Sequence, residues 1–415
     1  MIPGALAAPF FVSALLVGQL EAQSDTTARI LPAAQAPAGP LADPLVPQTL
    51  VAAGAGPRIL ELAHGDHPVV GLRLFVPIDE AAAEGGAGWI LARLARQRVE
   101  QASRRLGAEV SVRRTPAGIA YTVVGARTDF DYLAYLIRMA ASQPDPDAIA
   151  DARRELAGAT DGLLETGPGQ VELELRLRTS RGTPVAGTPG SVAGLTSATV
   201  LDVWSRTHRT EDMTLLVRGP VERALLLASL SGLGAPDPTV PIRPNAPPPV
   251  EPVPPSLNLL RRFTGRAWTG FAPGDPALPV LARLAARALA GQEGDFEARI
   301  RVWDGGGGPV LAVTGVAFPV DFPSLNSALD GVLSRAAGLV TDDAFVEAVD
   351  EVRREWLLEL TDPVGRLNAV GEDLDATGRP TATRDRIAAL DSLTPADLLD
   401  VIERLRGTAT EVTIR

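Results

Sequence analysis

Apolar and polar positions follow two different periods along the chain from about residue 57 onward. Short runs rich in Val, Ile, Leu and Tyr predict β-strands, and apolar residues spaced three or four apart predict amphipathic helices. In the first part of the chain the pattern predicts strands at residues 59–62, 69–78, 109–113, 119–124 and 213–218, and helices at residues 89–106, 129–141, 147–164 and 195–206. This order of elements predicts a mixed α/β unit.

The second part of the chain repeats this plan. Residues 195–203 are echoed by residues 393–401, and the Arg-Arg-Glu sequence at 153–155 recurs at 353–355, in each case within a predicted long helix. Two matches in the same order, both displaced by about 200 residues, favour a duplicated unit. The alternative is that the Leu-Thr-x-Ala phrase of the first match only marks a capped helix start.

Composition places the boundaries between the predicted parts. The chain has 415 residues, more than one hydrophobic core usually supports, so two domains are expected. Residues 236–256 are rich in proline and predict a stiff linker between a first domain at 57–235 and a second at 257–415. Residues 24–56 are rich in Ala, Pro and Gly without periodicity and predict a disordered tether.

The first 23 residues are similar to a secretory signal peptide. Residues 6–17 form an apolar run too short to span a bilayer, and a cleavage site is expected after Ala22. We therefore expect an exported protein, periplasmic or secreted. A buried or disordered N-terminal tail is the alternative, because no Lys or Arg precedes the run. No later segment is apolar enough to predict a membrane span.

Charge and residue usage narrow the possible chemistry. The net charge of −11 argues against a nucleic-acid partner. The sequence has no Cys, which excludes disulfides, thiolate metal sites and a Cys nucleophile. Of its three histidines, His64 and His67 favour a polar turn over a zinc site, which would need further ligands. His208 favours capping of a helix end at the surface.

Two other features favour structural interpretations. Residues 305–308 are all Gly but lack the Lys and Ser or Thr of a phosphate-binding loop, so they predict a flexible hairpin turn. The Arg pairs at 104–105 and 113–114 are expected on solvated faces, with contact to acidic groups of a partner as the alternative.

Several short phrases occur in an order known from one peptidase family. They are Pro68-Val69-Val70 before a strand, Gly85-Gly86-Ala87, Leu106-Gly107-Ala108-Glu109 with the hairpin ending Tyr121-Thr122-Val123, Thr183-Pro184-Val185-Ala186-Gly187, and Arg209-Thr210-Glu211-Asp212-Met213-Thr214-Leu215. Over residues 57–415 the sequence resembles the insulinase-like, or M16, metallopeptidases. The resemblance implies an α+β fold of two homologous α/β-roll domains of the LuxS/MPP-like metallohydrolase type. In that family, two such domains form one side of a clamshell around a peptide-holding chamber.

The chain departs from this family where the metal should bind. The His-x-x-Glu-His motif places two metal ligands on one helix face beside a general base. By the resemblance these positions fall on Gly88, Leu91 and Ala92, and a third ligand, a Glu on a later helix, falls near Ala159. Trp89, inside the motif, is expected to pack in the core and fill the vacated site. We therefore expect no catalytic residue, no metal and no cofactor.

The family's second domain supplies an Arg and a Tyr that bind the substrate backbone. Arg301 matches the Arg, with Arg299 as its rival, and the Tyr position falls within residues 305–309 and is lost. Arg301 is thus the expected substrate-binding residue.

Together these observations predict a catalytically inactive homologue. It would pair with an active M16 peptidase subunit, which would supply the zinc site, and it would contribute to peptide binding. The alternative is a stand-alone exported binding or scaffold protein that uses the cleft between its domains. An active metallopeptidase with unusual ligands is the least favoured interpretation, because it would have to build its site from three scattered His residues.

Overall fold

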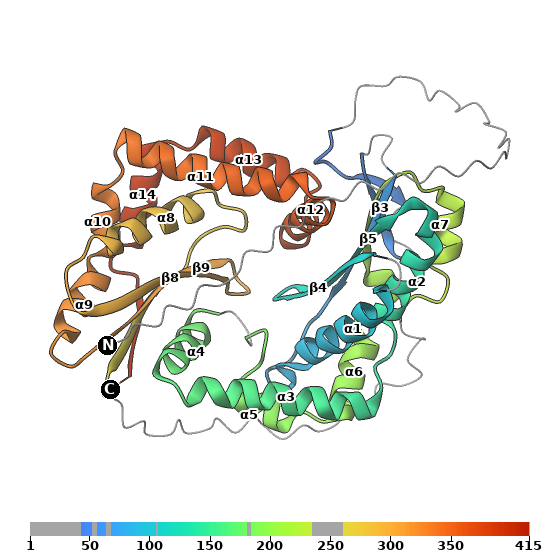
Figure 1. Cartoon of the computed structure of the whole chain (residues 1–415), viewed down its shortest axis with the longest axis horizontal. Coiled ribbons are helices and arrows are strands. Elements are labelled where there is room, and N and C mark those ends of the chain that lie inside the picture. Colours follow the sequence, from blue (N-terminus) through green and yellow to red (C-terminus); the bar gives the residue numbers. More distant parts are fainter. Residues whose placement is uncertain are drawn as a thin grey trace, which may run out of the picture. The chain divides into compact units, whose positions relative to one another are not determined.

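The computed structural model describes residues 43–51, 56–63, 68–104, 107–180, 184–234 and 260–414 (Figure 1). The predicted signal, most of the predicted tether, the proline-rich linker, and His64 and His67 lie outside these residues. Within them, the search for membrane-spanning segments finds no helix with the length and apolar character that a bilayer requires.

The first half is built on a six-stranded sheet with the order β1-β2-β6-β3-β5-β4. Its strands are β1 (Gln48–Val51), β2 (Arg58–Leu62), β3 (Val69–Pro77), β4 (Glu109–Thr115), β5 (Gly118–Ala126) and β6 (Thr214–Arg218). Its helices are α1 (Ala87–Ser103), α2 (Phe130–Ala141), α3 (Pro146–Leu164), α4 (Gly167–Thr179), α5 (Pro189–Gly194), α6 (Ser197–Thr207) and α7 (Arg223–Ser229). Every strand and helix predicted for this half is present, with ends within about three residues of expectation.

The second half is built on a four-stranded sheet with the order β10-β7-β9-β8. Its strands are β7 (Arg262–Trp268), β8 (Phe296–Asp304), β9 (Pro309–Ala317) and β10 (Thr410–Ile414). Its helices are α8 (Ala277–Ala290), α9 (Phe322–Asp330), α10 (Val332–Gly338), α11 (Asp342–Thr361), α12 (Pro363–Thr377), α13 (Ala382–Ser392) and α14 (Pro395–Leu405). Each half therefore combines one sheet with its own set of helices, as the α+β prediction requires.

The two sheets share one topology. In the first half β6, β3, β5 and β4 lie side by side, and in the second half β10, β7, β9 and β8 take the same places. All the neighbouring pairs within these two sets are antiparallel. The first sheet is extended by β1 and by β2, which pairs in parallel with β6. The predicted duplication is thus confirmed at the level of strand order.

Equivalent helices also repeat local contacts. The threonine side chains that precede α6 and α14, Thr196 and Thr394, each accept a hydrogen bond from the backbone N–H three residues later. The repeated Arg-Arg-Glu phrases lie on α3 and α11. Their glutamates, Glu155 and Glu355, form ion pairs with arginines on the equivalent helices α1 and α8. The sequence echoes therefore mark matching places in two copies of one unit.

One helix from each half covers the sheet of the other half. Residues Val171 and Leu175 of α4 pack in one apolar cluster with strands of the second sheet. Residues Leu367 and Val370 of α12 pack in another with strands of the first sheet. In Figure 1 α12 accordingly lies beside β3 and β5. Each sheet thus has its own helices on one face and an exchanged helix on the other.

Glycine permits the close approach of each exchanged helix. A Cβ atom at Gly71 of β3 would lie 2.2 Å from Leu367 Cδ1 of α12, closer than packed atoms approach. A Cβ atom at Gly265 of β7 would lie 2.7 Å from Leu175 Cδ1 of α4. Both strands therefore need a residue without a side chain where the helix crosses them.

Four elements of the first half were not predicted: β1, α4, α5 and α7. Strand β1 forms within the stretch expected to be a disordered tether, because it pairs with β2 and packs Leu50 and Val51 against the first core. Helix α4 begins with the sequence Gly167-Pro168-Gly169, which is typical of a turn. It forms where its apolar residues find the second sheet, a partner that lies far along the chain.

Candidate functional site

The three positions of the degenerate metal motif lie on the buried face at the start of α1. Gly88, Leu91 and Ala92 are all buried, as residues three and four apart on one helix face should be. None of them carries an atom that binds metal or transfers a proton. Among the residues that the structure describes, no group of three or more carboxylate or imidazole side chains is arranged to hold a metal ion.

A buried ion pair fills the space beside Gly88. Nη2 of Arg114, on β4, lies 3.2 Å from Oε2 of Glu80, which follows β3, and these two side chains are only 6% and 5% exposed. The other Glu80 oxygen accepts a hydrogen bond from the backbone N–H of Gly88. A Cβ atom at position 88 would lie 2.6 Å from Arg114 Nε and 2.9 Å from Glu80 Oε1. A metal-binding side chain at this position would therefore require the pair to move.

The charges of this pair depend on one another. Burial raises the pKa of Glu80, and the nearby Arg114 guanidinium and the Gly88 N–H work in the opposite direction. Burial lowers the pKa of Arg114, and the Glu80 carboxylate opposes that shift. A carboxylate at the first turn of a helix also interacts favourably with the helix dipole. Glu80 thus holds the start of α1 to strand β4.

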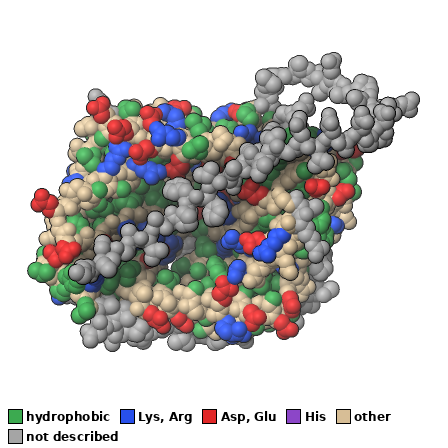
Figure 2. Space-filling model, in the orientation of Figure 1, with side chains coloured by type: hydrophobic (Ala, Val, Ile, Leu, Met, Phe, Trp, Pro, Cys, Tyr) green, Lys and Arg blue, Asp and Glu red, His purple; other side chains and the backbone are tan. Residues whose placement is uncertain are grey.

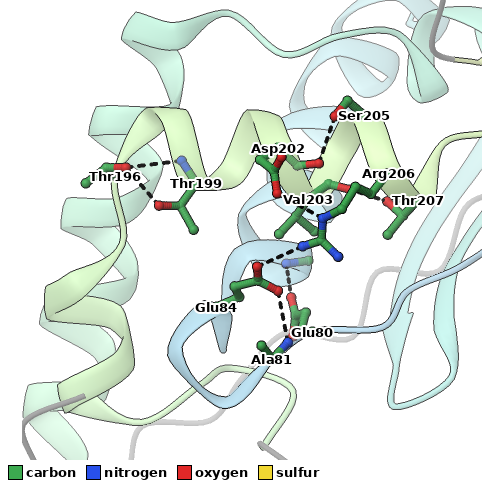
Figure 3. Close-up of polar contacts among 11 residues, drawn as sticks. Glu80, Ala81, Glu84, Thr196, Thr199, Asp202, Val203, Ser205, Arg206 and Thr207 are labelled. Atoms are coloured by element: carbon green, nitrogen blue, oxygen red, sulfur yellow. Dashed lines mark hydrogen bonds and ion pairs between the residues drawn. The ribbon is translucent and has the colours of Figure 1, made fainter. Parts of the chain in front are cut away.

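A second ion pair fastens the preceding turn. Arg206 of α6 lies 2.8 Å from Glu84, in the short 3₁₀ helix before α1, and 2.9 Å from Asp202 on its own helix (Figure 3). Figure 3 shows Glu80 and Glu84 close together, with Glu84 also accepting a hydrogen bond from the backbone of Ala81. The segment that leads into the motif is therefore held by two arginines, Arg114 of β4 and Arg206 of α6.

The region expected to carry the third metal ligand is apolar. Ala159 is exposed on α3, whereas Leu156 and Thr160 are buried. A Cβ atom at Gly86, just before α1, would lie 3.1 Å from Leu156 Cδ2. Leucine thus faces the start of α1, and the donor set does not fit a zinc ion.

Trp89 and Arg114 correct two expectations. Trp89 is only partly buried against the first core, and the space beside the motif is filled by Glu80 and Arg114 instead. Arg114 was expected on a solvated face with Arg113. The alternation of a strand sends them to opposite sides, so Arg113 is exposed and pairs with Glu372 at 2.7 Å, while Arg114 is buried.

A cavity of about 680 Å³ lies next to this buried pair. It is bordered by the β4–β5 turn and by the glycine-rich turn between β8 and β9. A smaller cavity of about 160 Å³ adjoins it, reaches Glu80, and shares Arg114, Arg176 and Asp304 as lining residues. Figure 2 shows basic and acidic side chains intermingled on the part of this face that the described residues form. The candidate binding site is therefore defined by the cavity and not by a surface charge.

The family's Tyr is expected within residues 305–309. Residues 305–308 form the turn that joins β8 to β9, and Pro309 begins β9. The backbone N–H of Gly305 donates a hydrogen bond to Gly308 O at 2.9 Å. Gly306 to Pro309 line the larger cavity. The predicted hairpin turn is confirmed, and it contributes backbone atoms to the cavity.

The predicted substrate-binding arginine lies on the exposed edge strand β8. Arg301 is 47% exposed, and its Nε lies 3.6 Å from Glu172 of α4. Its rival Arg299 is more exposed and lies 3.8 Å from Glu297 on the same strand. Neither lines the two cavities. Arg301 differs from Arg299 in that it reaches the exchanged helix.

The predicted surface role of His208 is wrong. Its backbone N–H ends α6 by donating to Trp204 O, but the imidazole is 1% exposed. Its Nε2 lies 2.9 Å from the Tyr121 hydroxyl, and burial lowers the pKa of His208 to about 3. A neutral imidazole in the first core is the result, because no solvent compensates a charge there.

Comparisons with known proteins identify the fold. No protein-family model matches the sequence, and no curated protein matches it. Solved structures match with high probability. A protease from Helicobacter pylori aligns with 89% of this chain and 98% of its own, at a TM-score of 0.70 and 12% identity. An M16-like peptidase from Alicyclobacillus acidocaldarius aligns with 88% of this chain and 97% of its own, at 0.63 and 14%.

The chain has the fold of the M16-like peptidases. The periplasmic protease PqqL from Escherichia coli also matches, at a TM-score of 0.64 and 13% identity, over 89% of this chain but 46% of PqqL. This chain therefore spans about half the length of PqqL. The M16-like fold agrees with the two homologous domains predicted from the sequence.

Proposed function

We propose that this chain is a catalytically inactive M16-like protein that pairs with an active zinc peptidase and contributes to peptide binding. The observation that carries the proposal is the start of α1. Gly88, Leu91 and Ala92 offer no ligand, and the Glu80–Arg114 pair fills the adjoining space. The fold of a peptidase is present, but the positions that would bind the metal are packed in the core, and Glu80 accepts a hydrogen bond from the backbone N–H of Gly88 at the start of α1.

One comparison supports a partner, and two observations favour export. The matching region is about half of PqqL, so the PqqL chain holds a further portion beside the part that matches, whereas the proteins from Helicobacter pylori and Alicyclobacillus acidocaldarius match over nearly their whole length. The apolar run at residues 6–17 and the description of PqqL as periplasmic favour export. We propose that the partner is an exported M16 peptidase subunit with an intact His-x-x-Glu-His motif.

A stand-alone binding protein is the second candidate. It is favoured by the larger cavity of about 680 Å³, which both halves of this chain line. A cavity of several hundred Å³ is of the size that holds small ligands or a few residues of a peptide. In this case the chain would bind peptide without any peptidase partner.

Native purification of the tagged chain from its own host, followed by mass spectrometry, separates the two candidates. A stoichiometric co-eluting M16 subunit with an intact zinc motif is the expected result. The isolated chain should neither retain zinc nor cleave peptides. Elution of the chain alone contradicts the subunit proposal, and peptide cleavage by the isolated, zinc-loaded chain contradicts inactivity.

Restoring the motif tests the filled site directly. The triple variant Gly88→His/Leu91→Glu/Ala92→His should hold no stoichiometric zinc, because the new His at 88 meets the Glu80–Arg114 pair. Metal content after dialysis is the measurement. A matched control adds Glu80→Ala and Arg114→Ala to open the space. Stoichiometric zinc in the triple variant without these two changes would show that the pair is no obstacle.

A further inference from the structure

Strand β8 forms one edge of the second sheet, and within the described residues only β9 pairs with it. The register between the two strands is unbroken over all nine residues of β8. Native proteins usually shorten, bend or cover such an edge, because its open backbone groups can pair with another chain. The opposite edge strand, β10, has only five residues, and Arg178 of α4 donates to its Glu411 carbonyl at 3.1 Å. The long edge at β8 therefore calls for an explanation.

The turn after β8 shows which backbone groups point to the open edge. The N–H of Gly305 donates to Gly308 O, so these two residues face each other as a hydrogen-bonded pair. Hydrogen-bonded and non-hydrogen-bonded pairs alternate along an antiparallel ladder. The odd-numbered residues of β8 therefore bond to β9, and the N–H and C=O groups of the even-numbered residues from 296 to 302 point outward.

The side chains along this edge have a charge pattern that is complementary to itself. The order is acidic, apolar, acidic, alanine, basic, apolar, basic, in Asp295-Phe296-Glu297-Ala298-Arg299-Ile300-Arg301. Two such segments, paired antiparallel about Ala298, place each Glu297 opposite an Arg299 and each Phe296 opposite an Ile300. The same register places Asp295, the residue before the strand, opposite Arg301.

Other registers of the same pairing lose this match. Only shifts that keep even-numbered residues opposite even-numbered residues join the outward-pointing backbone groups of both strands. A pairing centred on Ile300 joins these groups, but it places Arg299 opposite Arg301. Opposite charges across a strand pair stabilise it, and like charges directly opposite destabilise it. The register about Ala298 is therefore favoured by backbone and side chains together.

The charged side chains of this segment have only long contacts within the chain. Glu297 and Arg299 are 62% and 70% exposed and lie 3.8 Å apart on the same strand. Arg301 is 47% exposed and lies 3.6 Å from Glu172. Exposed pairs of this kind contribute little to stability. The apolar residues between them pack against the second core but are only partly buried, so a strand added at this edge would cover them further.

We propose that β8 pairs antiparallel with β8 of a second copy of this chain, centred on Ala298. The pairing joins two four-stranded sheets into one continuous sheet across a two-fold axis. Arg301, the predicted substrate-binding residue, then faces Asp295 of the second copy. The inference goes beyond the proposed function, because this surface needs no peptidase partner.

Analytical ultracentrifugation of the full-length chain tests the pairing. The parent chain should show a concentration-dependent equilibrium between monomer and dimer. The variants Glu297→Arg and Arg299→Glu each place like charges opposite one another twice, and each should raise the dimer dissociation constant at least about tenfold. The double variant Glu297→Arg/Arg299→Glu exchanges the two charges and should dimerise as the parent does.

A mixture of the two single variants gives the sharpest result. One chain then has arginine at both positions and the other has glutamate at both, so an equimolar mixture should dimerise although neither variant does so alone. Glu403→Arg, on α14, is the matched control, because its side chain is also 70% exposed and lies on a helix. It should leave the dissociation constant unchanged.

Hydrogen exchange shows whether the dimer uses the backbone of β8. The amides of Ala298 and Ile300 should exchange more slowly at concentrations where the parent chain is dimeric. A parent chain that stays monomeric up to about 100 μM overturns the inference. A dimer that both single variants leave intact, or a mixture that stays monomeric, overturns the proposed register. Thermal unfolding of each variant shows that a lost dimer is not a lost fold.

Discussion

The two exchanged helices cover equivalent faces of equivalent sheets, yet their interfaces differ in chemistry. If Gly71 of β3 is matched with Gly265 of β7, Arg73 matches Ala267. The strand registers then match Thr122 with Ala312. In the second half these positions are small and apolar beneath α4. In the first half Arg73 pairs with Asp375 of α12 at 2.6 Å, and the Thr122 hydroxyl donates to Asn368 Oδ1 at 2.7 Å.

This difference shows that the same packing of a helix on a sheet can be held by apolar contacts alone or by buried ion pairs and hydrogen bonds as well. Apolar contacts beneath α4 depend on area and tolerate small shifts along the helix. The bonds beneath α12 are directional, and the Arg73–Asp375 and Thr122–Asn368 contacts form in one register only. The first sheet thus specifies the position of its exchanged helix more narrowly than the second. The variants described next remove the polar bonds beneath α12 or the apolar contacts beneath α4, or give one sheet the residue that the other has.

Arg73→Ala should have the largest effect, because it gives β3 the residue that β7 has at the matching position. The change leaves Asp375, with a side chain 6% exposed, without its cation. Breaking a buried pair in this way costs about 4 kcal/mol of unfolding free energy. Urea unfolding measures it. The double variant Arg73→Met/Asp375→Leu should recover most of the loss, and a loss below about 1 kcal/mol in the single variant would contradict the comparison.

The second-largest effect is expected on the pH dependence of stability. Burial raises the pKa of Asp375 from 3.8 to about 6, outweighing the effect of Arg73. The folded protein therefore keeps a proton that the unfolded chain releases, and the free energy of unfolding falls as pH rises from about 4 to 6. Asp375→Asn should remove up to about 3 kcal/mol of this fall. Parallel pH profiles in urea test this. Identical slopes would show that Asp375 does not titrate in this window.

Leu175→Ala should weaken the apolar interface beneath α4 by about 2.5 kcal/mol, since the side chain is fully buried against the second sheet. Leu177→Ala is the matched control on the same helix, where the side chain is exposed, and should change stability by less than about 0.5 kcal/mol. Chemical unfolding of both variants gives the comparison. Similar losses would show that α4 is not seated as described.

Thr122→Val should produce the smallest effect. It keeps the shape of the side chain but leaves the buried Asn368 oxygen without its donor, at a cost of about 1 kcal/mol. Thr122→Ser keeps the hydroxyl and serves as the control. Stability is again measured by urea unfolding. If Thr122→Val is as stable as the parent chain, the hydrogen bond between Thr122 and Asn368 does not stabilise the fold.

The sequence predicted most elements of the first half because their apolar periods are local. It did not predict α4. This helix begins at Gly167, where a Cβ atom would lie 2.2 Å from Cδ2 of the Phe263 ring, so a glycine is needed there. That ring comes from a strand of the other half, and no local pattern reveals it. The packing of α4 on the sheet of the other half therefore could not be predicted from local sequence patterns.

The loss of the metal motif was readable from Gly88, Leu91 and Ala92, but the pair that fills the space was not. Glu80 and Arg114 are brought together by the pairing of β3, β5 and β4. One signal was available: in a strand, neighbours such as Arg113 and Arg114 point to opposite faces, so one of them is expected to be buried.

The exchange of α4 and α12 also bears on how the chain assembles. Cut between residues 234 and 260, it would yield two fragments, each with a sheet bare on one face and a helix that belongs elsewhere. Such fragments complement each other, and their reassembly would depend on their concentration. In the intact chain the linker supplies that concentration by keeping both halves in one small volume. The covalent connection thus makes an obligate pairing intramolecular.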